Sequence, residues 1–183
     1  MTHYRASQAW RDELGELLGK SFKGSRIGAD DDNATITFAD NCVIADDYVY
    51  FNVQLNHDKL TSGEVRPHLH WFQGSANVPN WYLAYRWQSN GAAQTTAWTP
   101  AAYTTNVFAY VSGDLVQITR FPPISAPVGA GLSDILQFRL ARDTGNVSGL
   151  FAGADPLTGD AAALMFDIHF RVSTVGSIEE YIK

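Results

Sequence analysis

The chain has 183 residues, of which 45% are hydrophobic and only 17% are charged, a composition that excludes a disordered chain and favours one globular domain. A net charge of −6 without a basic stripe argues against a nucleic-acid partner. No apolar run approaches the roughly 20 residues of a membrane-spanning helix. The first residues lack the apolar core of a secretory leader. We therefore expect a soluble protein, made in a host cytoplasm, with no membrane partner.

The N-terminal segment predicts a short amphipathic helix. In "SQAWRDELGELLG" (7–19), apolar residues recur at helical spacing, while acidic residues take the other face. Ser7 can cap the start of this helix, and Gly19 can end it. A helix of this length is marginal alone, so its apolar stripe must pack against the body or a neighbouring subunit. The stripe consists of Ala6, Trp10, Leu14, Leu17 and Leu18.

Beyond this arm, the period of the hydrophobic residues changes to two, as half-buried antiparallel strands require. Clear alternation predicts strands at 35–38, 48–55, 65–72, 80–88, 135–142 and 164–172. Weaker patterns add strands near 95–99, 105–111 and 115–121. Turn residues separate the strands, with no helical pattern between them. We therefore expect an N-terminal helix and arm (1–28) and an all-β domain (29–183), an antiparallel β-sandwich of the jelly-roll type.

The segment "VRPHLHWF" (65–72) carries the pattern closest to a chemical site. His68 and His70 are two residues apart, so they share one face of the predicted strand. His-x-His on a strand is also the spacing of a cupin metal site, in which a Glu follows closely and a third His comes from a later strand. His169 is the candidate third ligand and His57 is a possible fourth, which would complete a four-histidine metal site.

The residues after His70, "WFQGSANVPN", contain no carboxylate, and this weakens the metal interpretation. We favour a structural role, in which His68 and His70 pack or hydrogen-bond near His169 while Leu69 and Trp71 face the other way. No metal ligand and no cofactor is therefore predicted. A cupin-like metal-binding enzyme built on the histidines remains the minor alternative.

Other catalytic patterns are missing from the sequence. It has no G-x-S-x-G elbow, no glycine-rich phosphate loop, and no pair of carboxylates singled out for one cleft. Asp167 is the only carboxylate inside a strong strand pattern. We therefore predict no catalytic residues and no enzyme. Tyr48 and Tyr50 look exposed on their strand and could stack on sugars, but a subunit interface, where tyrosine is enriched, is favoured.

Four segments together resemble a family of tailed-bacteriophage virion proteins. The first, "FNVQLNHDKLTSGEVRPHLHWF", is similar to a family pattern of a strand ending in LPHD, a turn with Gly, and then PHxHW. "NWYLAYRW" and "LQFRLARD" resemble an aromatic strand and a strand ending on Arg and Asp. The C-terminal "FDIHFRVSTVGSIEEYIK" resembles a D-x-H-[YF] block followed by a Gly-Ser step and a final Lys. Asn56 and Ser173 depart from the pattern, where the family often has Pro and Asp.

The resemblance covers roughly Trp10 to Lys183 and implies a structural role in a virion. The favoured role is a capsid decoration (cement) protein on the capsid surface, which binds and stabilises the assembled lattice of the major capsid protein. Such a protein is expected to be a homo-oligomer, a dimer or a trimer. A tail, collar or fibre protein of the same virion is the alternative. The residues expected at contacts are Trp10, Leu14, Leu17, Leu18, Tyr48, Tyr50, Ile178 and Tyr181.

Overall fold

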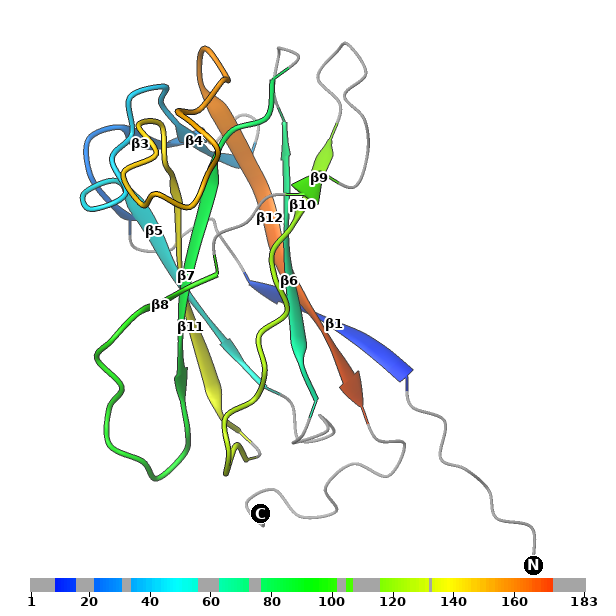
Figure 1. Cartoon of the computed structure of the whole chain (residues 1–183). Coiled ribbons are helices and arrows are strands. Elements are labelled where there is room, and N and C mark those ends of the chain that lie inside the picture. The colour runs from blue at the N-terminus through cyan, green and yellow to red at the C-terminus, as the bar shows by residue number, and fades with distance from the viewer. Residues whose placement is uncertain are drawn as a thin grey trace, which may run out of the picture.

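A computed structural model of the chain describes residues 9–15, 22–30, 34–55, 63–72, 77–101, 105–106, 116–131 and 133–172. Over these residues the chain is all-β, and its strands form two antiparallel sheets that pack face to face (Figure 1). The prediction of an antiparallel β-sandwich is therefore confirmed. No helix within these ranges is long and apolar enough to cross a membrane.

The two sheets are named A and B. In spatial order, sheet A consists of β3 (Ile27–Asp30), β4 (Thr35–Phe38), β12 (Ala161–Val172), β6 (Val65–Phe72), β10 (Gln117–Arg120) and β9 (Thr105–Asn106). A further strand, β1 (Ala9–Gly15), joins sheet A by pairing with β12. Sheet B consists of β2 (Phe22–Lys23), β5 (Tyr48–Gln54), β11 (Ile135–Arg142), β7 (Trp81–Gln88) and β8 (Thr99–Pro100).

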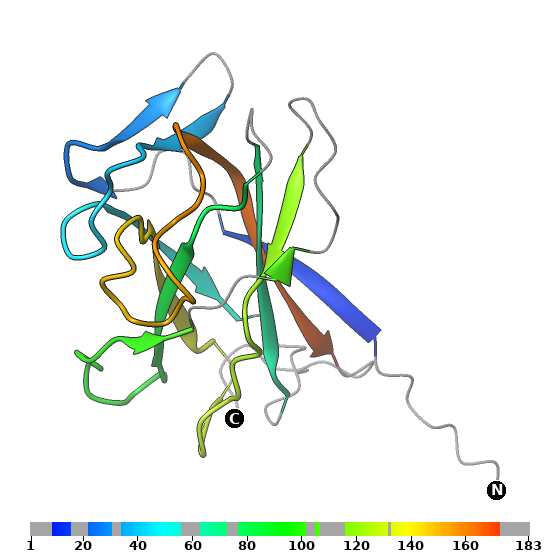
Figure 2. The ribbon, with the colours of Figure 1, turned by 45° about the horizontal axis from the view of Figure 1, so that its top comes forward.

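The strand order is that of a jelly roll. Four antiparallel pairs are nested within one another along the chain: β4 with β12, β5 with β11, β6 with β10, and β7 with β8. β4 and β6 belong to sheet A and β5 and β7 to sheet B, so the chain changes sheet at each of these connections (Figure 2). A long folded-over hairpin rolled up in this way is the double Greek key of a jelly roll.

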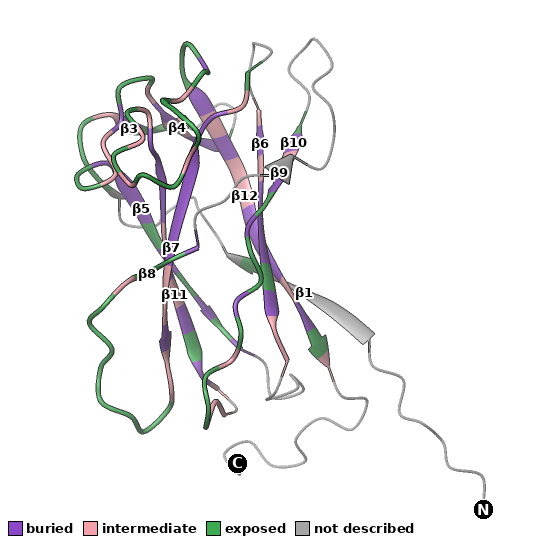
Figure 3. Ribbon diagram, in the orientation of Figure 1, coloured by how far each residue is buried: buried purple, intermediate pink, exposed green. Residues whose placement is uncertain are grey.

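Aromatic side chains from both sheets fill the interior. The apolar residues of β5 alternate with exposed polar ones, as the sequence predicts (Figure 3). Phe166 of sheet A packs against two rings of sheet B, with ring-centroid distances of 4.5 Å to Phe51 and 5.0 Å to Phe138. Trp71 and Trp81 meet across the same interior at 5.9 Å. Burial of each such side chain contributes about 1.5–3 kcal/mol to the free energy of unfolding, so this cluster holds the two sheets together.

The predicted N-terminal helix is wrong over Ala9–Gly15, because these residues form strand β1. The strand pairs antiparallel with residues 166–172 of β12, as the blue and orange-red arrows of Figure 1 show. On the same edge of β12, β4 reaches only residues 161–163. β1 therefore supplies hydrogen-bond partners to backbone groups that β4 leaves uncovered. The rest of the expected helix, 7–8 and 16–19, lies outside the described residues.

The N-terminal arm is more integrated than the sequence predicts. Trp10 and Leu14 are four residues apart, so they share a face at the helical period and also at the strand period, and their spacing does not discriminate between the two. β2 joins sheet B and β3 joins sheet A, although the sequence predicts neither strand. The proposed division at residue 28 thus falls inside β3, and both sheets include strands from the 1–28 arm.

One irregularity in β12 decides which of its side chains face the core. The pairing of β12 with β6 shifts register between Ala163 and Met165. Ala163 and Phe166 are both fully buried, so the inward positions are odd-numbered before the shift and even-numbered after it. The alternation of apolar residues in 164–172 predicts that Leu164 points inward with Phe166 and Ile168, but Leu164 is only partly buried because it lies at the shift. From Phe166 onward the alternation matches the prediction.

A buried arginine ties the end of β11 to the rest of the fold. Arg142 is fully buried, and its Nε donates to Asp155 Oδ2 at 2.8 Å. Its Nη1 and Nη2 donate to the backbone carbonyls of Phe38, Leu157 and Gly159. These hydrogen bonds link the end of β11 to β4 and to the loop between β11 and β12. Removing one member of a buried ion pair is strongly destabilising, because the other charge remains buried without its counter-ion.

We predict that Arg142→Met lowers the free energy of unfolding by about 3–5 kcal/mol, because the buried Asp155 carboxylate would lose its cationic partner and three carbonyls would lose a donor. Urea unfolding followed by tryptophan fluorescence measures the change. Lys23→Met is the matched control, since Lys23 and Asp46 form an exposed pair and its loss should cost less than about 1 kcal/mol. Equal effects of the two substitutions would contradict this role for Arg142.

A buried aspartate organises the turn before β11. The Asp134 carboxylate accepts hydrogen bonds from the Trp87 Nε1, the Ser89 hydroxyl, and the backbone N–H groups of Asn90 and Gly131. Burial by itself raises the pKa of Asp134, but these four donors outweigh it, and the net pKa lies below the ordinary value. The ionised form of Asp134 therefore stabilises the folded state.

We predict that the protein loses stability as the pH falls below about 4, the ordinary pKa of an aspartate in the unfolded chain. Below that pH, Asp134 becomes protonated in the unfolded chain while it stays ionised in the folded protein. The free energy of unfolding therefore declines until the pH has fallen below the lowered pKa of the folded state. Urea midpoints measured between about pH 6 and about pH 3 test this. Asp134→Asn should flatten the decline, and an unchanged pH slope in that variant would contradict the assignment.

Candidate functional site

The outer face of sheet A carries the residues that the sequence singles out. On β6, Leu69 and Trp71 are fully buried between the sheets. His68 and His70 therefore project from the opposite face of the same strand. The predicted arrangement of these four residues is confirmed.

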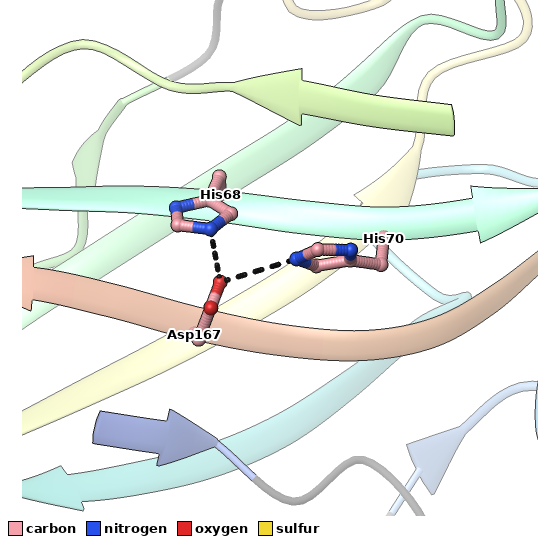
Figure 4. A group of neighbouring side chains, drawn as sticks. All are labelled: His68, His70 and Asp167. Atoms are coloured by element: carbon pink, nitrogen blue, oxygen red, sulfur yellow. Dashed lines mark ion pairs between the residues drawn. The ribbon is translucent and has the colours of Figure 1, made fainter. Parts of the chain in front are cut away.

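An aspartate of the neighbouring strand joins the two histidines. In the pairing of β6 with β12, Asp167 lies directly opposite His68. Its Oδ1 is 2.7 Å from the His68 Nε2 and 3.8 Å from the His70 Nε2 (Figure 4). Both imidazoles thus turn the same ring nitrogen toward one carboxylate oxygen. We call His68, His70 and Asp167 the His–Asp cluster.

Two members of the His–Asp cluster, His68 and Asp167, are buried, His70 is partly buried, and the contacts between them lack ordinary hydrogen-bond geometry. Only 5% of the Asp167 surface is exposed, although it faces away from the core. Neither its Oδ1 nor the His70 Nε2 has a hydrogen-bond partner among the described residues, so the 2.7 Å approach of His68 does not have hydrogen-bond geometry. Burial lowers the pKa of His70, the Asp167 charge opposes this, and the His68 and His169 rings lower it further. The neutral form of His70 is therefore favoured, and its ring nitrogen can act as an electron-pair donor.

His169 lies beside the cluster without joining it. Its ring centroid is 4.3 Å from that of His68, with the rings nearly perpendicular, so the expected proximity of His169 is confirmed. The two rings also border a surface hollow of about 420 Å³, together with Arg66 and Arg120 of β6 and β10. This hollow connects the His68 side of the cluster with solvent. His57, the other predicted candidate, lies outside the described residues.

Chemically, the cluster is a set of three donors suited to one cation. The two Nε2 atoms and one carboxylate oxygen all lie within 4.8 Å of one another. The sequence pattern identifies the histidines but not the position of Asp167 beside them, because Asp167 comes from a strand far along the chain and not from the residues directly after His70. The available signal was that Asp167 alone among the carboxylates sits in a strong strand pattern, on the same face as His169.

A second cluster covers the outer face of sheet B. The Tyr48 and Tyr50 rings meet edge to face at 4.9 Å, and the Trp98 ring is 5.9 Å from Tyr50. The Arg139 guanidinium lies 4.3 Å above Tyr48, and Arg86 lies 4.6 Å above Trp98. These contacts leave Tyr48 only 6% exposed, so its expected exposure is wrong. Tyr50 is exposed, and its hydrogen bond to the Tyr48 hydroxyl raises the pKa of Tyr50.

The other predicted contact residues are only partly described. Leu14 on β1 is 60% exposed, as expected of a residue available to a partner. Trp10 has a described backbone position, opposite Arg171 in the pairing of β1 with β12, but not a described side chain. The remaining four lie outside the described residues: Leu17, Leu18, Ile178 and Tyr181.

No protein-family model matches the chain, and no curated protein matches it. Among solved structures, dimeric latent PorU from Porphyromonas gingivalis is similar over 92% of this chain, with 11% sequence identity and a TM-score of 0.36. The chain spans 13% of the length of that PorU chain. A likeness at this level assigns neither a family nor a function.

Proposed function

We propose that this protein is a non-enzymatic structural component of a tailed-bacteriophage virion and decorates the assembled capsid. One observation carries the proposal: the four segments that resemble the virion family pair with one another in space. The PHxHW segment lies in β6, which pairs with β12. The C-terminal block starts within β12, at Phe166. "NWYLAYRW" forms β7 and pairs with β11, which is built from "LQFRLARD".

The two strand pairs also face each other across the interior. Trp71 of β6 meets Trp81 of β7, and Phe166 of β12 meets Phe138 of β11. The third block ends on Arg142 and Asp143, which both shape the following loop, since the Asp143 carboxylate accepts the backbone N–H groups of Val147 and Ser148. The resemblance thus falls on residues that build one continuous core. This supports a shared fold with the virion family, and the decoration role follows from the resemblance.

A decoration protein needs a rigid body and contacts on more than one side, because it bridges neighbouring capsid subunits. The sandwich supplies the body, and exposed apolar residues occur on both of its sheets. Leu14 is 60% exposed on sheet A, and Tyr50 is 38% exposed on sheet B. A protein that binds only the assembled lattice shifts the assembly equilibrium toward it. We propose the major capsid protein as the partner and a dimer or trimer as the bound form.

The proposal predicts that virions containing this chain carry it in hundreds of copies, as the symmetry of a capsid lattice requires. Quantitative mass spectrometry of purified particles measures the ratio of this chain to the major capsid protein. Particles stripped of the chain should melt at a lower temperature than complete ones, because bound ligand stabilises the state that binds it. A copy number limited to a few rings would overturn capsid decoration and favour the tail, collar or fibre alternative.

Single substitutions test the contact surface. Leu14→Ser and Tyr50→Ser should each reduce occupancy of stripped capsids at least about tenfold, because buried apolar anchors dominate interface energies. Val147→Ser is the matched control, since Val147 is a similarly exposed apolar residue, 66% exposed, on a loop. All three variants should unfold within a few degrees of the native protein. Undiminished occupancy by both Leu14→Ser and Tyr50→Ser would contradict the proposed contacts.

A further inference from the structure

We propose that His68, His70 and Asp167 form a binding site for one divalent transition-metal ion, for which Zn²⁺ is the probe. The inference goes beyond the virion role and does not depend on it. It rests on the outer face of sheet A, where three donor groups from two adjacent strands converge. Figure 4 shows the two imidazoles of β6 and the carboxylate of β12 directed toward one point.

The donor set matches the preferences of such an ion. Imidazole nitrogen and carboxylate oxygen are the protein ligands of zinc and its neighbours in open three-ligand sites, where water or another ligand takes the remaining position. All three ligand atoms lie within 4.8 Å of one another, so a modest closing movement brings them to one ion. The carboxylate charge offsets part of the charge of the ion, and each of the two imidazoles offers a ring nitrogen as a ligand atom.

The hydrogen bonding of the cluster points to the same conclusion. Asp167 is 95% buried by residue surface, and its Oδ1 makes no well-aligned hydrogen bond with the described residues, where it faces the Nε2 atoms of His68 at 2.7 Å and His70 at 3.8 Å. The His70 Nε2 is buried and is also without such a partner in the described part of the chain. Buried polar atoms are normally hydrogen-bonded, and leaving them unpaired costs free energy. A shared cation would satisfy the Asp167 Oδ1 and both ring nitrogens at once.

The backbone holds these donors in place. Met165 pairs with His70 and Asp167 pairs with His68, immediately after the register shift in β12. Without that shift, the alternation would turn Asp167 into the core, since a one-residue slip exchanges the two faces of a strand. Irregularities of this kind often re-aim a side chain beside a functional site. The neighbouring Phe166 and Ile168 are fully buried, so the strand cannot rotate to withdraw the carboxylate.

The surroundings define how the ion would arrive and how tightly it would bind. The hollow beside His68 and His169 gives an approach from solvent. Arg66 and Arg120 also line it, and their positive charges oppose a cation. We therefore expect half-saturation in the micromolar range, about 1–10 µM, and not the far tighter binding of a closed four-ligand site.

Isothermal titration of the metal-free full-length chain with ZnCl₂ tests the site. The expected result is saturation at one zinc ion per chain and a rise in melting temperature, because the ion would fasten β6 to β12. Asp167→Asn and His70→Gln should each weaken binding about 100-fold or more, since the first removes the carboxylate charge and the second an imidazole ligand, while both nearly preserve side-chain size. Circular dichroism establishes that each variant is folded before titration.

His169→Gln is the matched control, because His169 lies on the same face of β12 as Asp167 but outside the ligand set. It should bind zinc with an affinity within about threefold of the native chain, a change of less than 1 kcal/mol. Either of two results would overturn the proposal: no saturable zinc binding by the native chain, or native affinity in a folded Asp167→Asn. Binding lost equally in His169→Gln would also overturn it, by showing that Asp167 and the two β6 histidines are not the ligand set.

Discussion

The pairing of β6 with β12 is the interaction on which the rest of the structure depends. It joins the two central strands of sheet A, and its register decides which side chains face sheet B. Trp71 and Phe166 enter the core, and the same alternation sends His68 and Asp167 to the outer face. A slip of one residue would turn His68 and Asp167 toward sheet B and the aromatic side chains toward the outer face. The hydrophobic core and the His–Asp cluster are therefore specified together, by a single register.

In sheet B, buried polar groups at the two ends of β11 fix the arrangement of the neighbouring loops. Asp134 precedes the strand and gathers four donors from neighbouring turns, while Arg142 ends it and binds Asp155 and three carbonyls. Buried ionic groups are costly to desolvate, so they contribute little net stability over a well-packed apolar core. Their effect lies in selecting one arrangement of the loops, because any other arrangement leaves a charge unpaired.

The proposed virion role and the proposed metal site rest on separate observations that coincide at β6 and β12. The first follows from sequence blocks that become paired strands, and the second from ligand atoms that the same pairing brings together. A metal ion there would link β6 to β12, the two central strands of sheet A, and so oppose local opening of this sheet.

The local alternation of hydrophobic residues explains how much of the fold could be predicted from the sequence. β5, β7 and β11 lie within a residue of their expected ranges, because burial of one face imposes a period of two. β1 was mistaken for a helix, since Trp10 and Leu14 fit either period. The sequence by itself determined the all-β class and the shared face of His68 and His70, which follow from alternation between near neighbours. Only the tertiary structure decided that β1 pairs with β12 and that Asp167 meets the histidines, because strand register joins residues far apart along the chain.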